Sequence, residues 1–162
     1  MHSKIIAVLC IALFYCSCSG GFSKGIKKDL STGLTATYNG FALEDIYLSS
    51  NDSRLSSNQV TLGDKVSIMA SGVNNFTEKE GKVFPGCTIV LTDTAGKELL
   101  NLPDAFADMV AGTTKDQATT LRAQLNTGDP MVAGATYHLK ARFFDKNNAA
   151  SEIVANADIT MK

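Results

Sequence analysis

Apolar and polar residues alternate along most of the chain from Leu34 onward, and this pattern constrains the fold more than any other feature of the sequence. A period of two places successive side chains on opposite faces of a β-strand. The clearest run consists of Tyr137, Leu139, Ala141 and Phe143, each separated from the next by one residue of another kind. Repeats of this kind predict strands that bury one face.

Turn residues separate the alternating segments, as at Asn39-Gly40 and Pro85-Gly86. The stretch 102–108 breaks the alternation, and its Pro and Asp residues favour a short helical turn, which we expect to be a crossover between two sheets. The predicted strands span residues 34–38, 42–48, 66–72, 87–93, 98–100, 118–125, 137–143 and 153–161. Seven or eight strands with one short helical crossover predict an all-β antiparallel sandwich.

The stretch Gly134-Ala135-Thr136-Tyr137-His138-Leu139-Lys140-Ala141 resembles the approach to the penultimate strand of fibronectin type III and related immunoglobulin-like domains. This resemblance implies an immunoglobulin-like sandwich in which the hydroxyl group of Tyr137 binds backbone upstream of it. The chain contains no Trp, so it lacks the buried Trp of an antibody-type domain.

The N-terminus has the three parts of a secretory signal: a basic start at Lys4, an apolar run from Ile5 to Cys16, and small residues after the run. The run is shorter than the ~20 residues that a membrane-spanning helix needs. The stretch Leu13-Phe14-Tyr15-Cys16-Ser17-Cys18 resembles the relaxed lipobox of Bacteroidetes-type bacterial lipoproteins. That resemblance implies a signal peptide over 1–17, removed in the mature protein, and a lipid on Cys18 that anchors the chain to a membrane. Secretion without lipid is the alternative.

Residues 18–32 are small, polar and rich in Lys, which predicts a flexible tether before a single folded domain over 33–162. In surface-exported lipoproteins of the type that the lipobox resembles, acidic residues tend to follow the acylated cysteine. Here the first charged residues after Cys18 are Lys24, Lys27 and Lys28. We therefore expect a location in the cell envelope that faces the periplasm rather than the cell surface.

Cys87 and His138 are the candidates for a nucleophile and its base. Cys87 is in phase with the apolar residues of its strand and His138 is out of phase with those of its own, so one side chain should face the core and the other the solvent. The chain has no Gly-x-Ser-x-Gly motif and no Asp-x-Asp-x-Asp-Gly loop. We therefore predict no enzyme, no cofactor and no metal site.

Two sets of residues are candidates for ligand binding. His138, Lys140 and Arg142 alternate along the outer face of one predicted strand, where they could bind an anionic glycan, a lipid head group or an acidic partner. A solvated sheet face explains the same pattern. Phe76 and Phe84 flank a charged loop; they could line a ligand site or plug the open end of the sandwich.

The charge balance of 15 Lys and Arg against 16 Asp and Glu gives no basic excess for binding nucleic acid. We expect a non-catalytic, lipid-anchored cell-envelope protein that binds a partner or has a structural role. The alternative is a glycan-binding accessory lipoprotein of a surface uptake system. In addition, Asp93-Thr94-Ala95 resembles an O-glycosylation signal of Bacteroidetes-type exported proteins.

Overall fold

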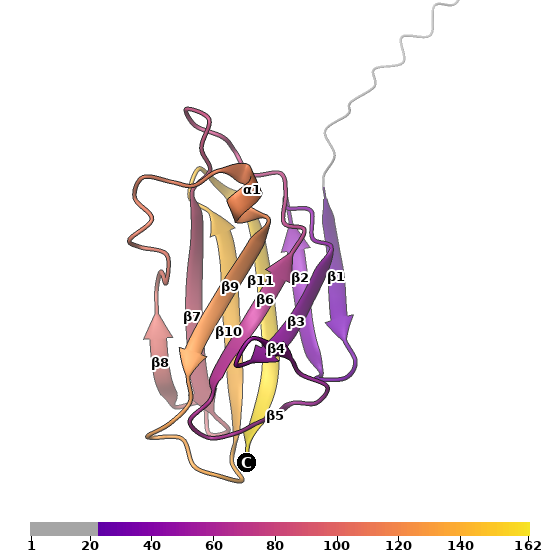
Figure 1. Ribbon diagram of the computed structural model, residues 1–162, viewed down its shortest axis with the longest axis vertical. Helices are drawn as coiled ribbons and strands as arrows, with labels where there is room; N and C mark the ends of the chain where they lie inside the picture. The colour runs from indigo at the N-terminus through magenta and orange to yellow at the C-terminus, as the bar shows by residue number, and fades with distance from the viewer. Residues whose placement is uncertain (1–22) are drawn as a thin grey trace, which may run out of the picture.

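The computed structural model describes residues 23–162, which form two β-sheets packed face to face (Figure 1). The larger sheet has the strand order β1 (Lys24–Asp29), β2 (Leu34–Asn39), β11 (Asn148–Met161), β10 (Thr136–Asp145), β7 (Pro85–Asp93) and β8 (Glu98–Leu102), and the short β5 (Gln59–Val60) pairs with the end of β11. The smaller sheet has the order β4 (Ser53–Arg54), β3 (Asp45–Ser50), β6 (Lys65–Ser71) and β9 (Thr120–Asn126). All of these pairs are antiparallel except β5 with β11.

The prediction of an all-β antiparallel sandwich is confirmed. Strands β3, β6 and β9 face strands β11, β10, β7 and β8, which is the strand arrangement of an immunoglobulin-like sandwich. The hairpin of β1 and β2 extends the larger sheet beyond that arrangement. The described residues contain eleven strands rather than seven or eight, because β1 and the two-residue strands β4 and β5 carry no alternating apolar pattern of their own.

The core lies between the two sheets, and the alternation read from the sequence has the right phase. In β10 the side chains of Tyr137, Leu139, Ala141 and Phe143 are buried, while that of His138 faces solvent. The same phase holds in β7, β9 and β11, where every second side chain is buried over most of the strand. Burial of these apolar side chains is the main force that holds the sheets together.

The chain crosses from the larger to the smaller sheet between β8 and β9, as expected, but the helix lies later than predicted. Residues 105–108 form a turn, and the helix α1 spans Lys115–Ala118. Thr114 caps this helix by accepting a hydrogen bond from the backbone N–H of Gln117, whose side chain accepts one from Thr114 in return. Asp104 instead accepts hydrogen bonds from the backbone N–H groups of Cys87 and Phe106, so it fixes the loop to β7 rather than starting a helix.

The tether predicted over 18–32 needs correction, because its residues Lys24–Asp29 form the edge strand β1. This strand pairs with β2 along its whole length, and the carbonyl of Ser23 accepts a hydrogen bond from the N–H of Gly40. The folded domain therefore starts before residue 33. The predicted signal peptide and Cys18 lie outside the described residues.

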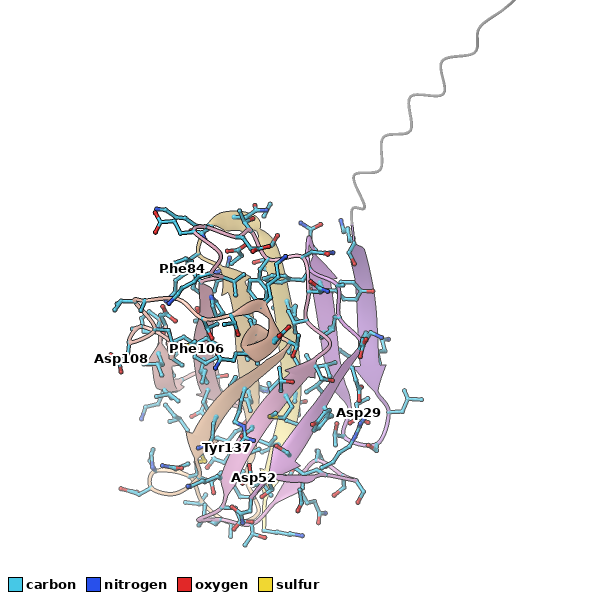
Figure 2. The ribbon with its side chains drawn as sticks, turned by 45° about the horizontal axis from the view of Figure 1, so that its top comes forward. Asp29, Asp52, Phe84, Phe106, Asp108 and Tyr137 are labelled. Carbon is cyan, nitrogen blue, oxygen red and sulfur yellow. The ribbon has the colours of Figure 1, made fainter. Side chains whose placement is uncertain are left out.

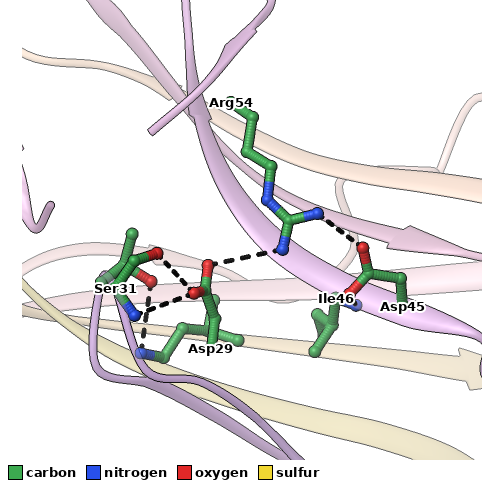
Figure 3. A network of polar contacts seen from close by, with 7 residues as sticks. Asp29, Ser31, Asp45, Ile46 and Arg54 are labelled. Atoms are coloured by element: carbon green, nitrogen blue, oxygen red, sulfur yellow. Dashed lines mark hydrogen bonds and ion pairs between the residues drawn. The ribbon is translucent and has the colours of Figure 1, made fainter. Parts of the chain in front are cut away.

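One polar network ties β1 to the smaller sheet (Figure 3). Arg54 of β4 lies between two carboxylates, with one guanidinium nitrogen 2.7 Å from Asp45 Oδ2 and the other 3.8 Å from Asp29 Oδ2. The guanidinium also lies over the ring of Tyr47, 4.5 Å from its centroid. These contacts join β1, at the edge of the larger sheet, to β3 and β4 of the smaller sheet. Over residues 23–162 no helix is long and apolar enough to cross a membrane.

Candidate binding surface

The outer face of the larger sheet, which points away from the smaller sheet, gathers polar side chains from its two central strands. We call this surface the polar face. Its central side chains are His138, Lys140 and Arg142 of β10 and Glu152, Asn156 and Asp158 of β11. The β10–β11 register places His138 directly opposite Asp158 and Lys140 directly opposite Asn156. Such cross-strand neighbours are close enough for their side chains to interact.

The three basic residues predicted to form a stripe do lie together, but two of them have acidic partners. His138 Nδ1 lies 2.5 Å from Asp158 Oδ1, and Arg142 Nε lies 2.5 Å from Glu152 Oε2. Lys140 is exposed and has no carboxylate within 4.0 Å among residues 23–162. Over β10 and β11 the polar face is therefore nearly neutral, and Lys140 is the unpaired cation of these two strands.

Two adjoining hollows mark this surface. One has a volume of about 330 Å³ and lies between β7, β10 and β11, with side chains that include Thr92, His138 and Lys140. The other has the same volume of about 330 Å³ and lies between β2, β11 and the loop that holds Asn58. Both are lined by the segment 156–158. We call the two hollows together the trough; their lining comes from β2, β11, β10 and β7.

An aromatic ring lies farther along β10, but its surroundings cover it. Phe144 lies over Gly86 of β7, so close that a Cβ atom at Gly86 would stand 2.3 Å from the ring. The guanidinium of Arg142 lies above the same ring, 4.7 Å from its centroid. Phe144 therefore offers little free surface on which a sugar could stack.

The two aromatic candidates from the sequence, Phe76 and Phe84, lie at the end of the sandwich opposite Tyr137, where Figure 2 shows Phe84. Phe76 is buried and packs on Phe41, with the ring centroids 4.6 Å apart. It thus belongs to the core and cannot face a ligand, which fits the plug alternative. Phe84 is half-buried beside Gly112.

Cys87 and His138 do not form a catalytic pair. Cys87 is buried opposite Phe143, whereas His138 is exposed opposite Thr92, five positions along the same strand pair. Burial, and to a lesser degree the nearby Asp104 carboxylate, raises the pKa of the Cys87 thiol to about 12. The predicted inward and outward phases of these two residues are confirmed.

Tyr137 has the hydrogen bond that the sequence resemblance implied. Its hydroxyl oxygen accepts a hydrogen bond of 2.9 Å from the backbone N–H of Val132, upstream of β10. The bond holds the loop before β10 against the end of the core. It thereby fixes the start of the strand that carries His138.

The sequence interpretation missed the side chains that β11 supplies, namely Glu152, Asn156 and Asp158. Their signal was present, since Asn156 and Asp158 alternate with the buried residues of the predicted strand 153–161. Pairing that strand with its neighbour as a hairpin would have placed Asp158 beside His138. Among residues 23–162 no group of three or more His, Cys, Asp or Glu side chains is placed to hold a metal ion.

No protein-family model and no curated protein matches the sequence. Among solved structures, the chain is similar to chicken MD-1, described in its crystal structure as complexed with lipid IVa. The two share 15% sequence identity with a TM-score of 0.37, and the match covers 86% of this chain and 98% of MD-1. A likeness at this level carries no conclusion about the ligand of this chain.

Proposed function

We propose that the protein is a non-catalytic, lipid-anchored binding module of the bacterial cell envelope, and that the polar face is its ligand-binding surface. The trough is the observation that carries this proposal. Its lining combines amide, hydroxyl, imidazole, carboxylate and ammonium groups on a rigid sheet. Such groups, held in fixed positions, give a ligand its orientation and specificity.

The proposed anchor is the lipid on Cys18, supported by the lipobox resemblance. Each buried CH₂ group of an acyl chain contributes about 0.8 kcal/mol to membrane binding, so more than one chain on the same cysteine gives a stable anchor. We place the protein in the cell envelope, facing the periplasm.

Mass spectrometry of the mature N-terminus tests the anchor. Expression of the full chain in a bacterium should yield a protein that begins at an acylated Cys18 and fractionates with membranes. The Cys18→Ser variant should lose the lipid and the membrane association. If the chain without the substitution has a mature N-terminus that carries no lipid, the proposed lipid anchor is overturned.

A glycan is the ligand class that the trough favours, because Asn58, Asn156 and the threonines beside them suit the hydroxyl groups of a sugar. Because the Phe144 ring beside this surface is covered, recognition in the trough would depend on hydrogen bonds and on Lys140. We propose this as the second candidate, the role of an accessory protein in glycan uptake. Proteins remain the other partner class for the same surface.

A glycan array probed with the mature chain, residues 18–162 carrying Cys18→Ser, tests the ligand class. Asn156→Ala should weaken any glycan binding about tenfold or more, because it removes a hydrogen-bonding amide from both hollows. Asn126→Ala is the matched control, since Asn126 is an exposed amide on β9 of the other sheet. Equal losses of glycan binding in the two variants would show that the glycan does not bind in the trough.

The absence of catalysis is also part of the proposal. At neutral pH the Cys87 thiol is protonated and buried, so we expect no labelling by iodoacetamide in the folded protein and rapid labelling in urea. Fast labelling of the native protein would instead support a cysteine enzyme.

A further inference from the structure

The edge strand β1 carries three lysines, Lys24, Lys27 and Lys28, in a segment that the sequence suggested was a tether. The alternation of the strand places Lys24 and Lys28 on the outer face of the larger sheet, with Ile26 between them. Ile26 is 66% exposed. β1 thus presents a fixed Lys-Ile-Lys row to solvent.

No acidic residue of the neighbouring strands neutralises this row. Its partners in β2 are the uncharged Thr35, Thr37 and Asn39. In β11, the next strand, Glu152 is already paired with Arg142. Among residues 23–162, none of the three lysines of β1 has a carboxylate within 4.0 Å.

A hollow of about 420 Å³ adjoins the row, lined by side chains that include Lys24, Ile26 and Thr37. It lies on the side of the molecule at which the chain enters, because β1 is the outermost strand of the larger sheet and is the first described strand (Figure 1). The hollow combines the Lys24 ammonium group, the apolar side chain of Ile26, hydroxyl groups, and the carboxylate of Glu152, which is paired with Arg142.

The chain length between Cys18 and β1 keeps this row near any membrane that holds Cys18. Six residue steps separate Cys18 from Lys24. At about 3.3–3.6 Å per step, an extended chain of that length spans at most roughly 20 Å. A lipid on Cys18 would therefore hold the start of β1 close to the bilayer surface.

We propose that β1 is a membrane-contacting strand, in which Lys24 and Lys28 bind anionic phospholipid head groups while Ile26 enters the interface. This inference rests on the proposed function, because the lipid on Cys18 is what brings β1 to the bilayer. Basic residues near an anionic surface add to the attraction of a lipid anchor. The strand acts as the second anchoring signal and orients the sandwich on the membrane.

Lysines on an edge strand also prevent edge-to-edge pairing of sheets. That role predicts that loss of the lysines causes self-association without any change in vesicle binding. The two roles therefore differ in what they predict for the same variant.

Co-sedimentation with vesicles tests the proposal on the mature chain, residues 18–162 with Cys18→Ser, so that no lipid contributes. We expect binding to vesicles of phosphatidylglycerol and phosphatidylcholine, weaker binding as salt is added, and little binding to phosphatidylcholine alone. Lys24→Glu/Lys28→Glu should lower the partition coefficient about tenfold or more. Ile26→Asp should lower it as well.

Lys65→Glu/Lys97→Glu is the matched control. It changes the net charge by the same amount at two exposed lysines outside β1, one at the start of β6 and one in the β7–β8 turn. We expect its partition coefficient to stay within about twofold of the parent chain. Equal losses in the two double variants, or no binding of the parent chain to the anionic vesicles, would overturn the proposal.

Failure of this inference is distinguishable from failure of the anchor. An acylated Cys18 combined with vesicle binding that does not depend on Lys24 and Lys28 removes the membrane-contacting strand alone. An unmodified N-terminus removes the anchor, and with it the reason for β1 to meet a bilayer. Self-association of Lys24→Gln/Lys28→Gln, which removes both charges instead of reversing them, with unchanged vesicle binding assigns the lysines to edge protection and overturns the proposal.

Discussion

Asp29 is a buried carboxylate whose surroundings keep it ionised. Its side chain is only 7% exposed, and its Oδ2 is the one buried side-chain oxygen or nitrogen of the described chain without a hydrogen bond. Burial alone would raise the pKa of Asp29. Hydrogen bonds from Ser31 and Thr32, together with the charge of Arg54, outweigh that effect and hold the pKa below its usual value. The carboxylate thus stabilises the end of β1.

We expect Asp29→Asn to lower the free energy of unfolding at pH 7 by about 1–2 kcal/mol, since charge-assisted hydrogen bonds are lost. A carboxyl group whose pKa is lowered by folding stabilises the protein above its unfolded-state pKa of about 3.9. That contribution disappears as the pH falls through the folded-state pKa. Urea denaturation of both chains should therefore show a smaller difference in the free energy of unfolding at pH 3 than at pH 7. The same difference at both pH values would contradict the role of the ionised carboxylate.

At the scale of elements, the strands that pack on the core could be predicted from the sequence. The strands that contribute no apolar row to the core could not be predicted. The predicted strands 137–143 and 153–161 lie within β10 and β11, because their inward positions are apolar, but β11 starts five residues before the predicted strand, at Asn148. The inward positions of β1 are Gly25, Lys27 and Asp29, and its apolar residue points outward. No periodicity argument detects such a strand, because backbone pairing with β2 and the contacts of Asp29 hold it in place.

The pairing of β7 and β10 depends on a glycine beneath an aromatic ring. Because a Cβ atom at Gly86 would overlap the ring of Phe144, we expect Gly86→Ala to lower the free energy of unfolding by about 1–3 kcal/mol. In the Phe144→Ala background the same substitution should cost much less, because the ring is gone. Chemical denaturation of the four chains gives the coupling energy. Additive effects would show that the ring simply moves aside.

At the scale of the whole molecule, the candidate surface could be predicted only in part. The outward positions of His138, Lys140 and Arg142 follow from periodicity within one strand. The pairing of His138 with Asp158 and of Arg142 with Glu152 depends on the register between two strands, which periodicity does not specify. Prediction of the trough would require still more, namely the relative placement of β2, β7, β10 and β11.

Integration of β1 into the sandwich leads to a test at the same scale. If residues 18–32 were a tether, a chain starting at residue 33 would be as stable as one starting at residue 23. The structure predicts a loss of about 2 kcal/mol or more in the shorter chain, because the β1–β2 hydrogen bonds and the Asp29–Arg54 contact disappear together. Urea denaturation of both chains, 23–162 and 33–162, measures the difference.

Removal of β1 also turns β2, with its uncharged outer row, into the edge of the larger sheet, so the shorter chain should self-associate more readily in sedimentation velocity. Equal stability and equal sedimentation of the two chains would mean that β1 is dispensable, and that its lysines are held near the sandwich only by the chain.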